Sequence, residues 1–401
     1  MTAEVRPTAV PAVVRALFDA ALALVRQSSS GSVALARLAG IVDLDAVPTR
    51  FRAPVARELD AAVAATGDPL PLGKVERELR SAWGAAPAAV LDALDSEPLA
   101  VTASAQVHRG ELEGQPVAVK LRRPGLAGAV RADLALLDAL GPPIGRVFGA
   151  LDAGALLREA REGALDELDL EHAGATQRRL ARASRRLHGV TVPAVHSELS
   201  TPGVLVSELL EGPTLAQRAP DDPGAVARAL VRFSVGAPRA IAVAPADPRA
   251  DHVLLLPGGG IGLLGAGAAR PVDRDRHDQA LDALAALRAG DRDAFAGALA
   301  RMDLLPPEAA DQAFDLVDHL LGGLLRGPVR LTARGLCGLT ERALAALPTA
   351  LPLAARLTPD PPDVWPLRML GQLAALLAGL DATEDWGALA LTAGRQGWSS
   401  G

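Results

Sequence analysis

The chain has 401 residues, with 41 lysines and arginines against 47 aspartates and glutamates, which gives a formal charge of -6. This acidic balance argues against a protein that binds nucleic acid or an anionic membrane through bulk charge. Aromatic residues make up 2% of the chain and tyrosine is absent, which argues against stacking platforms for single-stranded nucleic acid. Hydrophobic residues make up 49%, so wholesale disorder is excluded.

Arginine has replaced lysine almost completely, since only Lys74 and Lys120 remain, and the chain contains no asparagine. The one cysteine, Cys337, cannot form an internal disulfide, which suits a reducing compartment. No basic segment followed by an apolar core opens the chain, and the apolar run 369–380 is shorter than the roughly 20 residues that span a bilayer. We therefore expect a cytoplasmic protein without an export signal or a transmembrane helix.

The first ninety residues have the spacing of apolar residues that is typical of amphipathic helices. The first of these, 11–27, ends at a serine-rich stretch, and its polar face is not rich in basic residues. We expect it to pack on the rest of the protein, with membrane docking as the alternative. The predicted helices are 11–27, 33–46, 50–65, 74–83 and 86–94.

A β-hairpin is predicted next, from residues 105–112 and 116–121 around a Glu-Gly turn. Alternation along the second strand puts Val117, Val119 and Leu121 on one face and Lys120 on the other.

Beyond the hairpin, one long helical stretch is predicted over 152–186, followed by further short strands and helices. Everything after about residue 275 is predicted to be helical. Between these two helical regions, the predicted strands are 190–192, 204–208, 253–256 and 261–264, and one helix is predicted over 223–235. This order indicates an α+β protein that is predominantly helical. We expect an N-terminal helical extension over 1–94, a β-rich lobe over 95–207, and a helical lobe with a helical tail over 208–401.

Few residue sets suggest chemistry on their own. The seven histidines never pair at the spacing of a zinc site, and no G-x-S-x-G elbow is present. Gly260, Gly262 and Gly265 form a G-x-G-x-x-G, but the helix and the acidic strand end that dinucleotide binding requires do not follow. Lys120 is the most informative residue, because a lysine in V-A-V-K on a strand can neutralise nucleotide phosphates. Taken alone, a solvated lysine on an exposed strand explains it equally well.

Several segments together resemble the AarF/UbiB family of atypical protein-kinase-like proteins, over about residues 33 to 390. Residues 104–109 resemble the second half of the Ala-rich nucleotide loop of that family, and Lys120 lies in its V-A-V-K motif. The other matching segments are R-P-G at 123–125, R-A-D-L at 131–134, E-x-D at 167–169, the strands and hinge at 192–193, 198–201, 204–206 and 208–212, and A-D-P at 246–248. The resemblance implies a kinase-like fold with two lobes.

The departures from the family pattern fall on its metal-binding and orienting residues. The catalytic-loop histidine falls on Pro245, and the metal-binding asparagine falls on His252. The D-F-G triplet falls on residues 265–267, which read Gly-Ala-Gly, and the glutamate that pairs with the lysine falls on Ala173. The K-x-G-Q signature falls on residues 37–40, where the lysine, glycine and glutamine are all changed.

These losses predict impaired phosphoryl transfer, because a kinase holds its Mg²⁺ ions with that aspartate and asparagine. The resemblance implies ATP as the ligand, bound weakly or not at all, and makes Mg²⁺ a doubtful cofactor. No metal ligand is assigned. The expected nucleotide-binding residues are Lys120, Ala103, Ser104, Ala105, Gln106, Glu208 and Leu210. Asp247 is the expected, degenerate catalytic residue, and Glu167, Asp169 and Asp251 are accessory acids.

The resemblance further implies a supporting role in isoprenoid-quinone or other isoprenoid-lipid metabolism, with a nucleotide as partner and peripheral membrane or lipid association. The charge and composition predict no nucleic acid as partner. We therefore expect a pseudokinase. Two alternatives stay open. One is an active Mg²⁺-dependent ATPase or kinase with a displaced metal site built from Asp247, Asp251, Glu167 and Asp169, and the other is a scaffold that binds no nucleotide.

Overall fold

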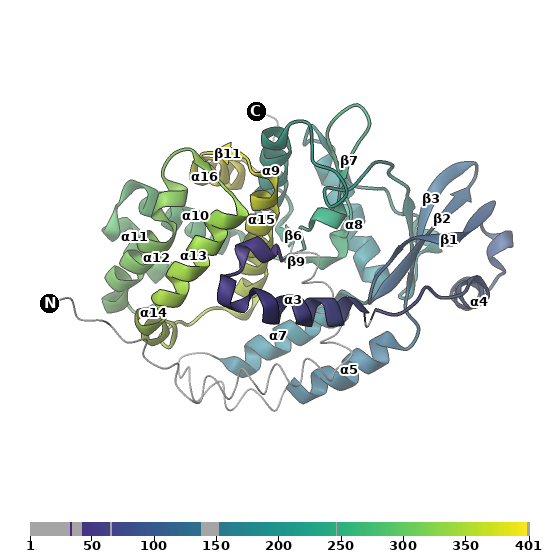
Figure 1. Ribbon diagram of the computed structural model, residues 1–401, viewed down its shortest axis with the longest axis horizontal. Helices are drawn as coiled ribbons and strands as arrows, with labels where there is room; N and C mark the ends of the chain where they lie inside the picture. Colours follow the sequence, from purple (N-terminus) through teal and green to yellow (C-terminus); the bar gives the residue numbers. More distant parts are fainter. Residues whose placement is uncertain (1–32, 34–41, 65, 138–151, 246, 399–401) are drawn as a thin grey trace.

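The computed structural model describes residues 33, 42–64, 66–137, 152–245 and 247–398. Figure 1 shows a sheet lobe at one end of the molecule and a helical lobe at the other, with α8, α9 and α15 between them. The combination of a small antiparallel sheet with many helices confirms the predicted α+β class. The predicted helix 11–27 lies outside the described residues.

The sheet lobe is built on four antiparallel strands in the order β1-β2-β3-β5. Their bounds are Ala93–Val101, Ala105–Leu112, Gln115–Arg122 and Val204–Glu208. The predicted hairpin is confirmed as β2 and β3, turning at Glu113 and Gly114, which both have positive φ. In its register, Lys120 lies between Val107 of β2 and Leu205 of β5.

One face of this sheet carries the core of the lobe. Val117, Val119 and Leu121 are buried there against Val75 and Leu79 of α4 (Leu72–Trp83). The predicted alternation along the strand is therefore confirmed, and it leaves Lys120 on the face that α4 does not cover.

The predicted helix 86–94 is wrong. Only a short turn, η2 (Pro87–Ala89), forms there, and β1 begins at Ala93. As an edge strand, β1 is largely exposed and loses regular register around Pro98, so its sequence lacks the alternation that identifies a strand. The predicted helix 33–46 lies mostly outside the described residues and ends in the turn η1 (Leu44–Ala46).

The helical stretch predicted over 152–186 is two helices. They are α7 (Ala153–Asp166) and α8 (Leu170–Ser184). The chain breaks at Glu167 to Asp169 because the Asp169 carboxylate accepts hydrogen bonds from the backbone N–H groups of Glu171 and His172 and begins a new helix. This break turns Glu167 toward the middle of the molecule.

The middle of the molecule holds α9 (Pro223–Ile241) and five short strands. The helix is longer than the predicted 223–235 and ends at Ile241. Strand β6 (Val243–Pro245) pairs with β9 (Ala269–Pro271), and a second small sheet has the order β4-β8-β7. The bounds of these three strands are Val190–Thr191, Ile261–Leu263 and Val253–Leu255. The glycines of the G-x-G-x-x-G pattern lie in and beside the β7–β8 hairpin, and no dinucleotide-binding helix follows them.

The rest of the chain is helical, as predicted, apart from the two-stranded pair β10 and β11 (Val329–Arg330 and Thr383–Glu384). The helices are α10 (Arg274–Ala289), α11 (Arg292–Arg301), α12 (Ala310–Leu325), α13 (Ala333–Ala345), α14 (Leu347–Ala354), α15 (Val364–Leu380) and α16 (Trp386–Gln396). Apolar side chains of α9, α15 and α16 share the largest buried core. This packing holds α15 in the middle of the protein, beside β6.

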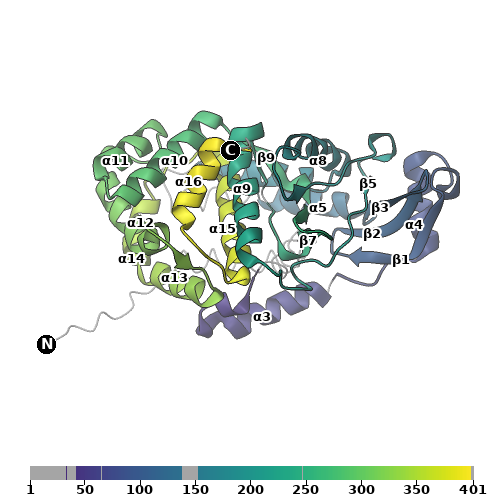
Figure 2. The same ribbon diagram turned by 90° about the horizontal axis from the view of Figure 1, so that it is seen from above.

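Two helices complete the described chain. Helix α3 (Thr49–Ala64) lies along one side of the molecule. The turn η1, which precedes it, packs on α13, and Arg50 at the start of α3 lies 3.6 Å from Glu341 of α13. Figure 2 shows α3 leading from the helical lobe toward the sheet lobe. Helix α5 (Leu126–Leu137) packs against α7. Among the described helices, none is long and apolar enough to cross a membrane.

Candidate functional site

The candidate site lies where four separate parts of the chain meet. Glu167 follows α7, Asp247 follows β6, His252 ends the turn η5 (Ala250–His252), and Arg368 lies on α15. Lys120 of β3 is near enough for its charge to act on His252. The structure therefore brings together the lysine and two of the acids expected from the sequence, and it adds an arginine from the tail.

Arg368 binds both acids at once. Its Nη1 donates to Glu167 Oε1 at 2.6 Å, and its Nη2 lies 3.5 Å from Asp247 Oδ1. Only 4% of the Glu167 side chain and 7% of the Asp247 side chain are exposed. Burial lowers the pKa of Arg368, but the negative charges of Glu167 and Asp247 raise it by more. The pKa of Arg368 is therefore raised above its usual value. A permanent cation therefore lies between two carboxylates that the sequence assigned to the active cleft.

The third acid of the cleft, Asp251, is held by another arginine. Arg249 donates its Nε to Asp251 Oδ1 at 2.9 Å and is itself buried. Burial works to raise the pKa of the Asp251 carboxyl, but the hydrogen bond from Arg249 lowers it below its usual value. Asp251 is therefore an ionised partner of Arg249.

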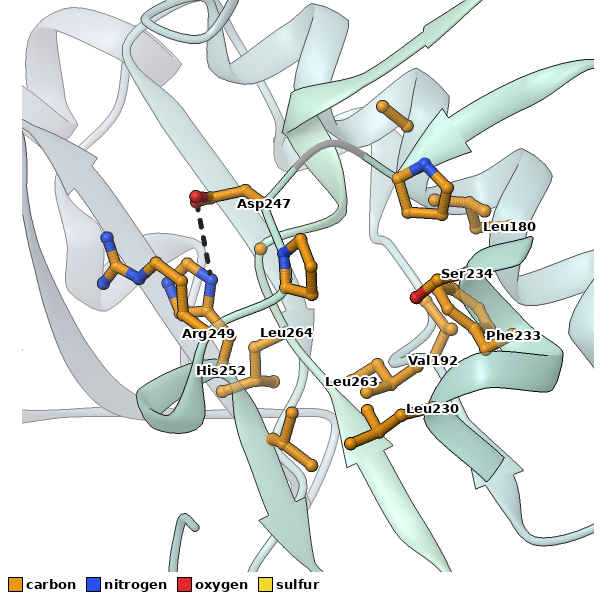
Figure 3. Close-up of a pocket in the computed structure, with 15 residues that line it drawn as sticks. Leu180, Val192, Leu230, Phe233, Ser234, Asp247, Arg249, His252, Leu263 and Leu264 are labelled. Atoms are coloured by element: carbon orange, nitrogen blue, oxygen red, sulfur yellow. Dashed lines mark ion pairs between the residues drawn. The ribbon is translucent and has the colours of Figure 1, made fainter. Parts of the chain in front are cut away.

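His252 fills the space where the D-F-G aspartate would extend. A Cβ added at Gly265 would lie 2.3 Å from His252 Nδ1, and Gly265 has a φ of +72°. Figure 3 shows the imidazole facing Asp247, with 3.7 Å between Nδ1 and Oδ2. Burial lowers the pKa of His252 to about 4, helped by Arg249 and Lys120, so the ring is neutral at pH 7. No aspartate fits at position 265 while this ring stays in place.

The last residue of this triplet, Gly267, is also closely packed. A Cβ added at Gly267 would lie 2.5 Å from the Cβ of Ala173. Ala173 is buried on α8, at the position where the resemblance expects the glutamate partner of the lysine. The small residues at these two positions let η6 (Ala266–Ala268) pack directly on α8.

The cavity behind Asp247 is small. Its volume is about 40 Å³, whereas pockets for ligands of drug size occupy roughly 300–1,000 Å³. Apart from Asp247, His252 and Arg249, its labelled lining in Figure 3 is mostly apolar, with Val192, Leu230, Leu263 and others on the side away from Asp247. This space admits a few water molecules and no nucleotide.

The expected nucleotide loop is the bend between β1 and β2. Ala103 and Ser104 form it, and the Thr102 hydroxyl closes it by accepting from the backbone N–H of Ala105 at 3.0 Å. Ala105 is buried.

The side chain of Gln106 points to the opposite face of the sheet from Lys120. It is fully buried, accepts from the backbone N–H of Leu70 at 2.7 Å, and lies 2.8 Å from the buried ring of His108. The side chain therefore anchors the N-terminal extension to the sheet and is not available to a nucleotide.

The expected hinge residues lie at the end of β5 and just after it, and their side chains make contacts within the protein. Glu208 is exposed and accepts from the backbone N–H of Ala194 at 3.2 Å. Leu210 packs toward Gly262 of β8. Asp169 also has a structural task, because it caps α8.

The donor set does not fit a kinase-type pair of magnesium ions. Glu167 and Asp247 share Arg368, Asp251 is paired with Arg249, and His252 is a poor ligand for a hard cation. Across the described residues, no three His, Cys, Asp or Glu side chains form a group that could hold a metal ion.

Sequence reasoning missed Arg368 and Arg249. Arg249 follows the A-D-P motif directly, so that motif could have directed attention to it. Arg368 lies some 120 positions beyond Asp247 in a helix that carries no motif, and only the packing of α15 brings it to the cleft.

This chain is similar to known kinase-like proteins. The family model of the ABC1 atypical kinase-like domain matches residues 63–299. Among curated relatives, AarF domain-containing kinase 1 of Drosophila melanogaster is 28% identical over 35% of this chain and 28% of its own length. The probable protein kinase UbiB of Aeromonas hydrophila is 31% identical over 34% and 26%, and the mitochondrial atypical kinase coq-8 of Caenorhabditis elegans is 27% identical over 48% and 25%.

The matched stretches thus span about a quarter of the length of these relatives. A solved structure titled as the complex of Rv3197 with erythromycin from Mycobacterium tuberculosis has a similar fold, with a TM-score of 0.62 and 21% identity. The alignment covers 94% of this chain and 96% of that one, and together with the family model it confirms the kinase-like fold. With more than half of its residues matched by the family model, this chain belongs to the ABC1 atypical kinase-like family, the family of AarF and UbiB.

Proposed function

We propose that this chain is a pseudokinase of the ABC1 family, with impaired phosphoryl transfer and weak or absent ATP binding. The observation that carries the proposal is the position of Arg368 between Glu167 and Asp247. Phosphoryl transfer needs metal ions that bridge the β- and γ-phosphate oxygens, and a guanidinium bound to the acids competes with those cations. The ring of His252 beside Gly265 supports the same conclusion.

The test is a titration of the full chain with ATP, with and without Mg²⁺. Calorimetry measures binding, and release of inorganic phosphate measures turnover. We expect Mg²⁺ not to strengthen ATP binding, and no turnover above the protein-free rate. Mg²⁺-enhanced binding together with turnover that Asp247→Asn abolishes would overturn the proposal in favour of an active enzyme. Asparagine keeps the size of the side chain, so a loss would report the carboxylate rather than packing.

Lys120 separates weak ATP binding from none. Its place on the sheet face that α4 leaves uncovered and its closeness to His252 support a retained phosphate contact. If the wild-type chain binds ATP, Lys120→Ala weakens that binding. If the substitution changes no nucleotide measurement, or if no binding exists, the chain is a scaffold.

We propose further that the protein supports isoprenoid-quinone or related isoprenoid-lipid metabolism without catalysing a step of the pathway, in the cytoplasm and in peripheral contact with a membrane. Family membership supports this role. In a strain that lacks the gene, quinone content falls and both the wild-type chain and Asp247→Asn restore it. Unchanged quinone content in that strain would contradict the proposed role while leaving the pseudokinase proposal intact.

A further inference from the structure

A basic pocket lies apart from the cleft, where the carboxyl-terminal ends of α8, α9 and α16 come together. Its volume is about 670 Å³, within the range of small-molecule sites. Four arginines line it: Arg179 and Arg182 on one face of α8, Arg186 just after that helix, and Arg239 in the last turn of α9. None of the described lining residues is acidic, although the chain as a whole has a charge of -6.

We propose that this pocket binds a ligand that carries phosphate groups. Guanidinium groups are suited to this chemistry because their planar forks donate two hydrogen bonds to adjacent phosphate oxygens and stay charged at every physiological pH. The pocket also has an apolar part, formed by residues such as Ile241 and the buried ring of Trp398. An organic phosphate can place its phosphate against the arginines and its carbon skeleton against this apolar part.

Helix ends offer an ordinary reason for some of these arginines, because cations stabilise carboxyl-terminal ends. Arg179 meets that need, since its Nη2 donates to the carbonyl of Ile241 at 3.2 Å. Arg239 is also shared, with its Nη1 3.4 Å from Asp278 Oδ2. Three helix ends contribute about half a negative charge each, and four arginines face them. Stabilisation of the helix ends alone does not require four arginines.

The test measures binding of inorganic pyrophosphate to the full chain by calorimetry at fixed ionic strength, and binding to phosphatidylcholine vesicles with and without phosphatidic acid. Arg182→Glu reverses one charge in the pocket. Arg185→Glu makes the same change of charge three residues on, at an exposed position at the end of the same helix that does not line the pocket. Both side chains are exposed, and thermal melting of each variant checks that it is folded.

We expect Arg182→Glu to weaken pyrophosphate binding at least tenfold and Arg185→Glu to change it less than twofold. If Arg182→Glu weakens binding and Arg185→Glu does not, but only with vesicles that contain phosphatidic acid, the result supports the site. The phosphate group then belongs to a lipid headgroup. Equal losses in the two variants, no binding of either probe by the wild-type chain, or loss of binding in Lys120→Ala would overturn the proposal. Because the pocket shares no lining residue with the cavity behind Asp247, its failure would leave the pseudokinase proposal untouched.

Discussion

At the scale of single residues, Gly265 and His252 share one space, at the position where the resemblance expects a metal-binding aspartate. A glycine at position 265 removes the carboxylate that a kinase would use, and the histidine ring moves into the vacated space, with its Nδ1 2.3 Å from where a Cβ would be. The Nδ1 of the ring is buried and has no hydrogen-bond partner among the described residues. A carboxylate side chain therefore does not fit at position 265 while His252 keeps this position.

Gly265→Asp is expected to destabilise the protein instead of creating a magnesium ligand. The new Cβ collides with His252 and the residue is held at positive φ, which together cost about 2–4 kcal/mol. Chemical denaturation measures the loss. Gly258→Asp is the matched control, because Gly258 has a φ of +85° and a Cβ added there would have no atom within 4 Å. If both variants lose the same stability, the collision with His252 contributes nothing.

His252 also predicts how stability depends on pH. The folded state lowers its pKa from 6.5 to about 4, so between these values the unfolded chain binds more protons. The free energy of unfolding therefore falls as pH drops from about 6.5 toward 4, by roughly 3 kcal/mol at most from this residue. Asp251, which also has a lowered pKa, extends the loss to lower pH.

Urea denaturation at pH 7, 5.5 and 4.5 measures this dependence, and His252→Gln is expected to flatten it. His277 contributes with the same sign, because burial lowers its pKa as well, so the variant keeps part of the slope. Identical slopes in the wild type and His252→Gln would contradict the assignment.

At the scale of elements, a helix or strand was predicted correctly where its own sequence carries a local signal. The hairpin of β2 and β3 could be predicted because alternation and a Glu-Gly turn mark it, and its register then fixed which face holds Lys120. Strand β1 could not, since an exposed edge strand has no buried face to pattern its sequence. The break between α7 and α8 was missed because Asp169 reads equally well as a solvated charge inside one helix.

The structure gives Asp169 the role of a helix cap, and this can be tested separately from a role in the cleft. Asp169→Ala should lower stability by about 1 kcal/mol, whereas Asp169→Ser should lose little, because a serine hydroxyl also accepts from backbone N–H groups. Thermal melting distinguishes the two. Equal losses for alanine and serine would indicate that the charge matters and not the cap.

At the scale of the whole molecule, the cleft is completed by the tail of the chain. Arg368 reaches Glu167 and Asp247 only because α15 packs in the middle of the protein, against the same core as α9. Arg368 and Arg270 also lie near the ring of Trp365, at 5.8 and 5.2 Å from its centroid. The chain is rich in arginine, and arginines lie beside the acids Glu167, Asp247 and Asp251 of the cleft.

Removing Arg368 is the strongest test of this arrangement. Arg368→Ala leaves two nearly buried carboxylates without their shared cation, which should cost about 3 kcal/mol. Urea denaturation measures the loss, and Arg330→Ala, which breaks an exposed pair with Asp381, should change the midpoint little. Without this guanidinium, Glu167 and Asp247 should also gain affinity for Mn²⁺, a hard cation that carboxylate oxygens bind well. If Arg368→Ala is as stable as the wild type and binds Mn²⁺ no better, the arginine is not what keeps metal from the cleft, and the loss of the aspartate at position 265 must account for it alone.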